Sequence, residues 1–203
     1  LKNCGLRRIW RLVPAVLSMA VVRLFVSAVV NRVIFTKGCK DFLASVLGFN
    51  NWWQIFNKVS YFEAAGVPSP FTHCWSLAIE TQFYLIYPLI LLGIYKLAKS
   101  RGEGRVKRGL LFAGVTLLLA LISVILMIVL FDPQKDASRV YYGTDTRAFS
   151  LLFGALLAIM WEYRMVPRRL SASVNMVLGS VSFAALLVMT IAINGSSNFW
   201  YRG

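Results

Sequence analysis

The chain has 203 residues, of which 58% are hydrophobic and 15% charged, with a mean hydropathy of +0.66. A soluble domain carries about 25% charged residues, so the composition excludes an ordinary soluble protein and predicts a polytopic membrane protein. The net charge of +14 comes from short basic clusters between apolar runs, which favours cytoplasmic loops over nucleic-acid binding. Three cysteines without paired spacing and a single histidine favour neither a disulfide framework nor a metal site.

Five apolar runs follow one another along the chain, at residues 12–31, 75–95, 109–131, 148–162 and 172–193. Four of them have the ~20 residues that a helix needs to cross a bilayer, and the one at 148–162 is shorter. Because backbone groups in lipid must be hydrogen-bonded within their own segment, each run is predicted to be a helix. The predicted fold class is therefore all-α, a bundle of about five transmembrane spans.

Lysine and arginine are concentrated in alternate connections of this bundle. Segments 1–11, 96–108 and 163–170 hold 13 of the 22 basic residues, whereas segments 32–70, 132–147 and 194–203 hold eight in twice the length, with most of the acidic residues. Cytoplasmic loops carry the excess of Lys and Arg in membrane proteins. The first three segments are therefore predicted to be cytoplasmic and the other three to lie outside.

The outer segment 32–70 has helical spacing of apolar residues, at Phe42, Val46, Phe49, Trp53 and Phe56. This pattern predicts an amphipathic helix lying in the outer interface of the bilayer. A lid packed on the other helices would give the same pattern, and both interpretations stay open.

The segment after it, 73–88, carries a polar stripe through an apolar sequence. On a helix with ~100° per residue, one arc of roughly 80° contains His73, Ser76, Glu80, Tyr84 and Tyr87. A carboxylate within a membrane is costly unless it faces a partner, a cavity or water, so such residues usually serve a function. Glu80 is therefore the first candidate for general acid–base chemistry.

His73 is the second candidate for a catalytic group, although a lone histidine near a membrane surface is also typical of an interfacial hydrogen-bonding residue. It precedes Glu80 by ~10 Å along the helix axis, so the two cannot form a direct dyad. Ser76 stands four residues before Glu80, within hydrogen-bonding reach on a helix, and is predicted to orient it.

Two further stretches contain arginines that need an explanation. Residues 141–147 read Tyr-Tyr-Gly-Thr-Asp-Thr-Arg, and a turn with Asp145 or Thr146 as N-cap accounts for everything except Arg147. A cation in the first helical turn opposes the helix dipole, so Arg147 is predicted to pair with Glu80 or with a polar substrate. Arg23, halfway along the first run, must face a cavity or an acidic partner.

At the start of the chain, Arg8 and Arg11 flank Trp10 just before the first apolar run. An ordinary positive anchor at the membrane surface explains this cluster. A phosphate site is the functional alternative to this simpler explanation, because guanidinium groups bind phosphate oxygens in pairs.

These stretches together resemble the membrane acyltransferase family 3, which includes O-acetyltransferases of peptidoglycan, O-antigen and other surface polysaccharides. The resemblance lies in Arg-Ile-Trp-Arg-Leu-Val-Pro at 8–14, Asn-Trp-Trp at 51–53 with Ser-Tyr-Phe at 60–62, Trp-Ser-Leu-Ala-Ile-Glu-Thr-Gln-Phe-Tyr at 75–84, and Thr-Asp-Thr-Arg at 144–147. The sequences of these blocks are most similar to those of the family's Gram-positive peptidoglycan branch.

The resemblance implies acetyl-CoA as the donor at the cytoplasmic face and a cell-wall or surface-polysaccharide hydroxyl as the outer acceptor. It implies that Arg8 and Arg11 contact the donor's phosphates and that Arg147 orders the outer site or a polar acceptor. Glu80 would be the family's signature acid, and Tyr84 and Tyr87 would pass or position the acyl group. Residues 1–203 would then be an interior part of one transmembrane acyltransferase domain, located in the cell membrane.

One departure concerns the family's catalytic histidine, which lies on its first helix, eleven positions after an arginine. His73 does not match it, because Phe62 stands eleven positions earlier. We therefore expect the chain as given to be an inactive fragment that lacks this helix.

Two other classes of function fit the same charges. A transporter or flippase of lipid-linked or acylated precursors would use Glu80 and Arg147 without a covalent step. A scaffold subunit would use the polar stripe only to hold helices together, although neutral hydrogen-bonding residues would do so at lower cost.

Overall fold

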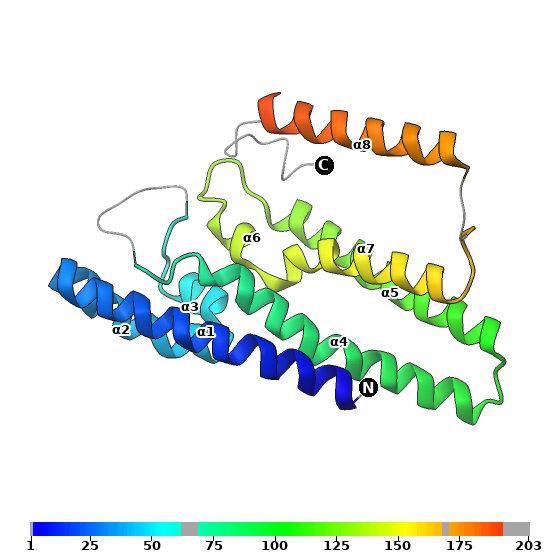
Figure 1. Ribbon diagram of the computed structural model, residues 1–203, viewed down its shortest axis with the longest axis horizontal. Coiled ribbons are helices and arrows are strands. Elements are labelled where there is room, and N and C mark those ends of the chain that lie inside the picture. Colours follow the sequence, from blue (N-terminus) through cyan, green and yellow to red (C-terminus); the bar gives the residue numbers. More distant parts are fainter. Residues whose placement is uncertain (1, 62–68, 168–170, 193–203) are drawn as a thin grey trace.

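The computed structural model describes residues 2–61, 69–167 and 171–192, and the side chains of residues 2–13, 15, 191 and 192 fall outside this description. The described residues form helices and no strands, which confirms the all-α prediction (Figure 1). In chain order the helices are α1 (Lys2–Val30), α2 (Arg32–Val46), α3 (Asn50–Phe56), α4 (Cys74–Ser100), α5 (Arg105–Leu130), α6 (Ser138–Tyr142), α7 (Thr144–Glu162) and α8 (Ala172–Ala192).

Each of the five predicted apolar runs lies in a helix, namely α1, α4, α5, α7 and α8. Among the described residues, three helices are long and apolar enough to cross a membrane: Cys74–Ser100, Arg105–Leu130 and Ala172–Thr190. In α1, the part whose side chains are described includes a further apolar stretch, Val16–Val30. The structure therefore fits a helical membrane bundle, and the number of five spans stays a prediction.

The three basic segments gather toward one end of the bundle. The N-terminal end of α1, the turn between α4 and α5, the end of α7 and the start of α8 all lie toward the right-hand side of Figure 1. Basic segments that are far apart along the chain therefore lie near the same end of the bundle, as the predicted orientation requires.

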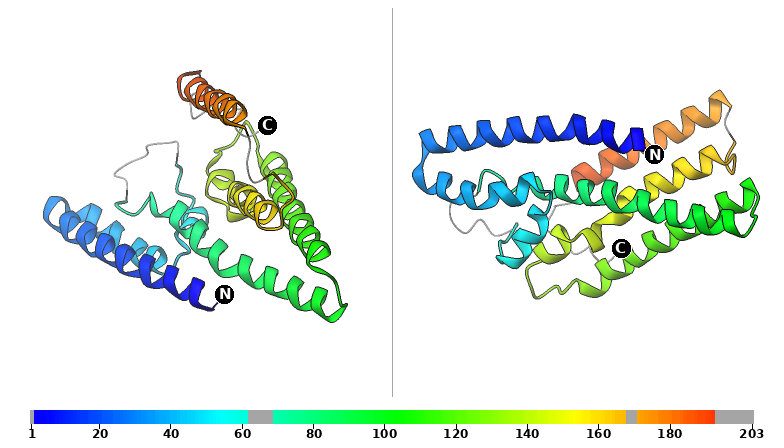
Figure 2. Two further views of the ribbon diagram at one scale, coloured as in Figure 1. Left: turned by 45° about the vertical axis from the view of Figure 1, so that its right-hand side comes forward. Right: turned by 90° about the horizontal axis from the view of Figure 1, so that it is seen from below.

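The outer segment 32–70 differs from its prediction. Its described residues form two helices: α2, which folds back beside α1 after a turn at Asn31, and α3, a separate short helix (Figures 1 and 2). The Asn31 Oδ1 atom accepts a hydrogen bond from the Val33 amide at 2.8 Å, which caps α2. Phe42 and Val46 pack against a buried cluster of Ala20, Phe71 and Cys74. The apolar face of α2 thus packs on other helices, as in the alternative interpretation.

Gly48 separates α2 from α3. Its φ is +73°, in the left-handed region that favours glycine, and a Cβ there would lie 2.9 Å from Cγ2 of Thr81 on α4. The break in the predicted helix is therefore also a point of close contact between the outer segment and α4.

Replacing Gly48 by alanine is expected to destabilise the protein by more than the ~1–2 kcal/mol that left-handed backbone costs a non-glycine residue, because Thr81 must also move. Gly102→Ala is the matched control, since Gly102 has a φ of +69° and nothing within 4 Å of its Cβ position. Thermal unfolding of the two variants in detergent measures the difference. Equal shifts in the unfolding temperature of the two variants would show that the contact with Thr81 adds nothing to the destabilisation.

The main helix–helix packing lies between α5 and α7, which run side by side (Figure 2). Ala120 of α5 and Leu152 of α7 are buried in a cluster with Tyr87 of α4. The fourth run also carries a stripe of small residues, Ser150, Gly154 and Ala158, but all three are exposed. The packing face of α7 is therefore a different one, and the described residues of 172–190 in α8 are exposed throughout.

Candidate functional site

The polar stripe of α4 passes from the surface into the bundle. His73 and Ser76 are exposed, Glu80 and Tyr84 are partly buried, and Tyr87 is buried. The stripe therefore lies on one helix, as predicted, but its residues have different surroundings and contacts.

Glu80 lies one and a half turns into α4. Its carboxylate takes part in none of the hydrogen bonds or ion pairs formed among the described side chains, and the four ion pairs there involve other acids. The predicted pair with Arg147 is therefore not formed. A partly buried carboxylate without a partner on a helix of this apolarity is the feature expected of a functional group.

The two residues predicted to assist Glu80 from the preceding turns have other positions. His73 is the N-cap residue of α4 and makes no side-chain capping bond. The Ser76 hydroxyl donates to the backbone carbonyl of His73 at 3.4 Å, so the predicted bond from Ser76 to Glu80 is absent. Both side chains are exposed, and neither contacts the carboxylate through a hydrogen bond.

Tyr87 was predicted to pass or position the acyl group, but its hydroxyl and its ring are both engaged in contacts within the bundle. Its hydroxyl is hydrogen-bonded to Oγ1 of Thr116 at 2.8 Å, and Thr116 in turn donates to the Phe112 carbonyl at 2.6 Å. Its ring stacks on Phe83 with 4.8 Å between ring centroids. Tyr84 meets the same phenylalanine edge-on, with 6.0 Å between centroids.

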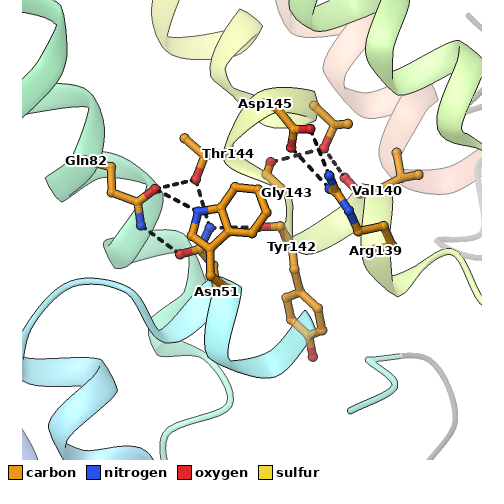
Figure 3. Close-up of polar contacts among 10 residues, drawn as sticks. Asn51, Gln82, Arg139, Val140, Tyr142, Gly143, Thr144 and Asp145 are labelled. Atoms are coloured by element: carbon orange, nitrogen blue, oxygen red, sulfur yellow. Dashed lines mark hydrogen bonds and ion pairs between the residues drawn. The ribbon is translucent and has the colours of Figure 1, made fainter. Parts of the chain in front are cut away.

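The Thr-Asp-Thr-Arg block opens α7 in a different way from the prediction. The N-cap residue is Gly143, which has no side chain to cap the helix. Neither Asp145 nor Thr146 is therefore the cap. The buried Thr146 hydroxyl donates to the Val140 carbonyl at 2.6 Å and ties α7 to α6. Asp145 instead makes two charged hydrogen bonds with Arg139, at 3.1 and 2.9 Å (Figure 3).

Arg147 is stabilised in the first turn of α7 by an aromatic ring. Its guanidinium carbon lies 4.5 Å from the ring centroid of Tyr141. A cation over a ring face is attracted by the ring's electrons, which offsets the unfavourable helix dipole. Tyr141 in turn stacks on Tyr61, with 4.2 Å between centroids, and lies 4.6 Å from Trp75.

A polar network that the sequence did not single out joins α3, α4 and the start of α7. Gln82 is at its centre: its Nε2 donates to the Gly48 carbonyl and to Asn51 Oδ1, both at 2.9 Å. Its Oε1 accepts from the Thr144 hydroxyl at 2.6 Å and from Trp52 Nε1 at 3.2 Å. Asn51 completes the network by donating to the Tyr142 carbonyl at 3.0 Å and to Thr144 Oγ1 at 2.8 Å (Figure 3).

Every donor and acceptor group of Gln82 is used in this network. Asn51 is fully buried, and its partners are 31 or more positions away along the chain. The one sequence signal for these residues was that amides stand among large apolar side chains, in Asn-Trp-Trp and in Glu-Thr-Gln-Phe-Tyr. A side-chain amide in such surroundings must find hydrogen-bonding partners, and here the partners are one another.

Comparison with known proteins gives relatives over the whole chain. It is 41% identical over 207 residues to "Peptidoglycan O-acetyltransferase OatA" of Listeria monocytogenes, and 39% identical over 207 residues to "Putative peptidoglycan O-acetyltransferase YrhL" of Bacillus subtilis. A "Putative O-acetyltransferase" of Staphylococcus aureus is 35% identical over 206 residues. The chain belongs to the same family as these O-acetyltransferases. It spans about a third of their length, with 32%, 31% and 33% of each covered.

The resemblance inferred from the motifs is thereby confirmed. No family model and no solved structure matches the chain. The motif blocks at 51–53, 75–84 and 144–147 are far apart in this sequence. The structure brings them together through Asn51, Gln82 and Thr144.

The residues predicted to contact the donor lie near the start of the chain. Arg8 and Arg11 lie in α1, and their side chains are among those outside the described residues. Arg23, which was expected to face a cavity or an acid, donates a hydrogen bond from Nη1 to the Pro70 carbonyl. It therefore connects α1 to the turn that precedes α4. Among the described residues, no three His, Cys, Asp or Glu side chains gather as metal ligands would.

Tyr142, next to the Thr-Asp-Thr-Arg block, carries a buried phenol at an energetic cost. The residue is fully buried, and its hydroxyl has no hydrogen-bonding partner in the described part of the chain. Burial raises the pKa of Tyr142 to about 12, with smaller contributions from Tyr61 and Asp136. The hydroxyl therefore stays neutral up to strongly alkaline pH.

Tyr142→Phe is expected to stabilise the protein by about 1 kcal/mol at neutral pH, because it removes a buried polar group that lacks a partner. The wild type should also lose stability between the unfolded pKa near 10 and about 12, since a raised folded-state pKa favours unfolding once the unfolded phenol ionises. The variant should lose less over the same range. Thermal unfolding from pH 8 to 11 in detergent checks both, and a destabilised variant would contradict this account.

Proposed function

We propose that this chain forms part of a membrane O-acetyltransferase that passes an acetyl group from cytoplasmic acetyl-CoA to a hydroxyl of peptidoglycan. The observation that carries the proposal is the Glu80 carboxylate, partly buried and without a hydrogen-bonded partner among the described residues, on a helix long enough to cross a membrane. The acceptor is suggested by two relatives that are named for peptidoglycan O-acetylation.

The arrangement of charges supports the direction of transfer. If segments 1–11, 96–108 and 163–170 are cytoplasmic, the start of α4 lies toward the outer face. Glu80 is six residues after Cys74, the first residue of α4, and so lies about 9 Å along the helix from that end. This depth supports a site at which an outer hydroxyl meets an acyl group that arrives through the bundle.

The reaction gives the two sets of charges different tasks. The carbon–sulfur bond of acetyl-CoA breaks and a carbon–oxygen bond to the acceptor hydroxyl forms. Glu80 would take the hydroxyl proton as that bond forms and release it to water at the outer face, and the thiolate of the released CoA would take a proton from water at the cytoplasmic face. Arg8 and Arg11 would bind the donor's phosphates at the opposite end, and Arg147 would contact the polar acceptor.

The test is to express the complete gene product in a bacterium that lacks wall O-acetylation of its own. Base-labile acetate is then measured on purified peptidoglycan, with a strain carrying the empty vector as control. Acetate above the control would support the proposal. Its absence, with the protein shown to be inserted in the membrane, would overturn the peptidoglycan assignment. Inside-out membrane vesicles given labelled acetyl-CoA test the donor, since transfer should then start from the exposed cytoplasmic face.

A further inference from the structure

The turn that joins α4 to α5 is strongly basic and lies beside the end of α7 (Figures 1 and 2). An ion pair connects Arg105 of α5 to Glu162 of α7 there. Segments 95–108 and 161–165 together hold seven Lys and Arg residues against two Glu, which leaves a net charge of +5. Both Glu residues are already ion-paired, so the described residues contain no further acid here to neutralise the surplus.

Arg108 differs from the other cations of these two segments. Its side chain is partly buried, whereas the others are exposed. Its Nε atom is buried without a hydrogen-bonding partner, and its guanidinium makes no ion pair among the described residues. The guanidinium carbon lies 5.7 Å from the ring centroid of Tyr95 on α4. An ordinary anchor at a membrane surface keeps its charge in water, and Arg108 instead holds its charge against an aromatic ring.

The two terminal nitrogens of Arg108 are accessible to a ligand. Neither Nη1 nor Nη2 is among the buried polar atoms, and neither donates a hydrogen bond within the described part of the chain. Their N–H groups form a planar fork that matches two oxygens of one phosphate group. Because packing of Nε and the Tyr95 ring already hold the fork in place, it loses little freedom when a phosphate binds.

The start of α5 adds to the attraction for an anion. Its first turn contains Arg105, Lys107 and Arg108 and no acid. A cation in this position opposes the helix dipole, whereas a negative charge is stabilised there. The N-cap residue Gly104 has no side chain that could cap the first backbone amides. A bound anion would therefore offset an arrangement of charges that is unfavourable by itself.

The depth of Arg108 indicates the source of the anion. Arg108 directly precedes the apolar run 109–131, which is long enough to cross the hydrocarbon core of a bilayer. On a helix that spans the membrane, its guanidinium then lies at the level of the lipid phosphates. Leu111 follows one turn later on the same face of α5 and is 43% exposed, as a side chain in contact with hydrocarbon would be. A soluble phosphate compound would contact Arg108 alone, whereas a lipid would contact both side chains.

We propose that Arg108 binds the phosphate group of an anionic membrane lipid, whose hydrocarbon chains lie against Leu111. The net charge of +5 around the site favours a lipid with a net negative charge, such as phosphatidylglycerol, over a zwitterionic one. An acidic segment of a protein is a poorer partner, because it would have to bring a carboxylate to the edge of the hydrocarbon, where an unpaired carboxylate is costly. The site does not depend on acetyl transfer, so a silent acetylation assay leaves it standing.

Modification of arginine by phenylglyoxal tests whether a lipid phosphate covers Arg108. The complete gene product is delipidated in dodecyl maltoside, a detergent without phosphate. It is then modified alone or with phosphatidylglycerol, diacylglycerol, inorganic phosphate or coenzyme A, and each modified arginine is quantified by mass spectrometry. Arg101 is the matched control, since it is exposed in the same turn at the end of α4.

Phosphatidylglycerol at about four times its dissociation constant should slow the modification of Arg108 about fivefold and leave that of Arg101 nearly unchanged. The other three additions should protect neither arginine. Equal protection of both arginines would show diffuse screening and overturn the site. Protection of Arg108 by inorganic phosphate or coenzyme A as strong as that by the lipid would overturn the lipid as its ligand. An Arg108 that is unreactive in detergent alone would be covered by protein, which also contradicts the proposal.

A pair of variants measures the contribution of Arg108 to lipid affinity. Arg108→Gln should weaken the binding of phosphatidylglycerol, followed by native mass spectrometry, at least about tenfold, because it removes both hydrogen bonds to the charged phosphate. Arg101→Gln removes the same charge from the same turn and should change the affinity far less. If Arg108→Gln disturbs folding, Arg108→Lys keeps the charge and should still lose affinity, since lysine has no planar fork. Equal affinities in the Arg108 and Arg101 variants would contradict the site.

Discussion

Glu80→Gln should reduce base-labile acetate on peptidoglycan by at least about 100-fold relative to the wild type at equal membrane abundance. General acid–base groups contribute typically 10²- to 10⁴-fold, and glutamine keeps the shape of glutamate while losing its ability to take a proton. The structure indicates little competing structural role, because Glu80 makes no hydrogen bond or ion pair among the described side chains. The protein should therefore fold and insert normally.

Glu162→Gln is the matched control for this experiment. Glu162 stands at the end of α7 with a side chain 66% exposed and a 3.3 Å ion pair to Arg105. An exposed pair of this kind contributes about 0–1 kcal/mol, so its loss should leave acetylation nearly unchanged. Acetate retained in Glu80→Gln would remove the carboxylate from the reaction. Equal losses in both variants would point to a general effect of removing an acid.

His73→Gln extends the same comparison to the second candidate residue. Its side chain is exposed and makes no capping bond, so a general effect on folding is small. Normal acetylation in this variant would remove His73 from the reaction and leave Glu80 as the acid–base group of α4.

The helices were predictable because each apolar run in lipid must satisfy its own backbone. Composition and the length of the apolar runs therefore sufficed for α4, α5 and α8, even though α4 carries a polar stripe. The outer segment was harder, because a helical pattern of apolar residues does not reveal a break. Gly48, with its left-handed backbone, divides the pattern into α2 and α3. The packing of α2 beside α1 is a tertiary property that the pattern leaves open.

The site was predictable as far as single helices determine it. Helical spacing placed Glu80 and Tyr87 on one stripe, but it carried no information about their partners. Tyr87 bonds Thr116, 29 residues away, and Arg147 lies over Tyr141 instead of pairing with Glu80. The first partner depends on how α4 packs against α5, and the second on the turn that joins α6 to α7. Neither arrangement follows from the spacing of residues on a single helix.

Gln82 shows most clearly what a single helix conceals, and its replacement should have the largest effect on stability. Gln82→Met keeps the length of the side chain and removes all four of its hydrogen bonds. Hydrogen bonds between membrane helices average about 0.6 kcal/mol, whereas a buried group left without a partner costs ~1–3 kcal/mol. The expected destabilisation is therefore about 2–5 kcal/mol, measured by reversible unfolding in mixed micelles.

Gln134→Met is the control, since Gln134 is exposed in the connection between α5 and α6 and uses its backbone amide rather than its side chain to bond Asp132. A double-mutant cycle with Thr144→Val separates the network from simple loss of packing. If Gln82 and Thr144 act together, the double variant should lose clearly less than the sum of the two single variants. Additive losses, or a Gln82→Met change no larger than that of the control, would mean that α3, α4 and α7 are held together by apolar contacts alone. The meeting of the three motif blocks would then be a consequence of packing and not its cause.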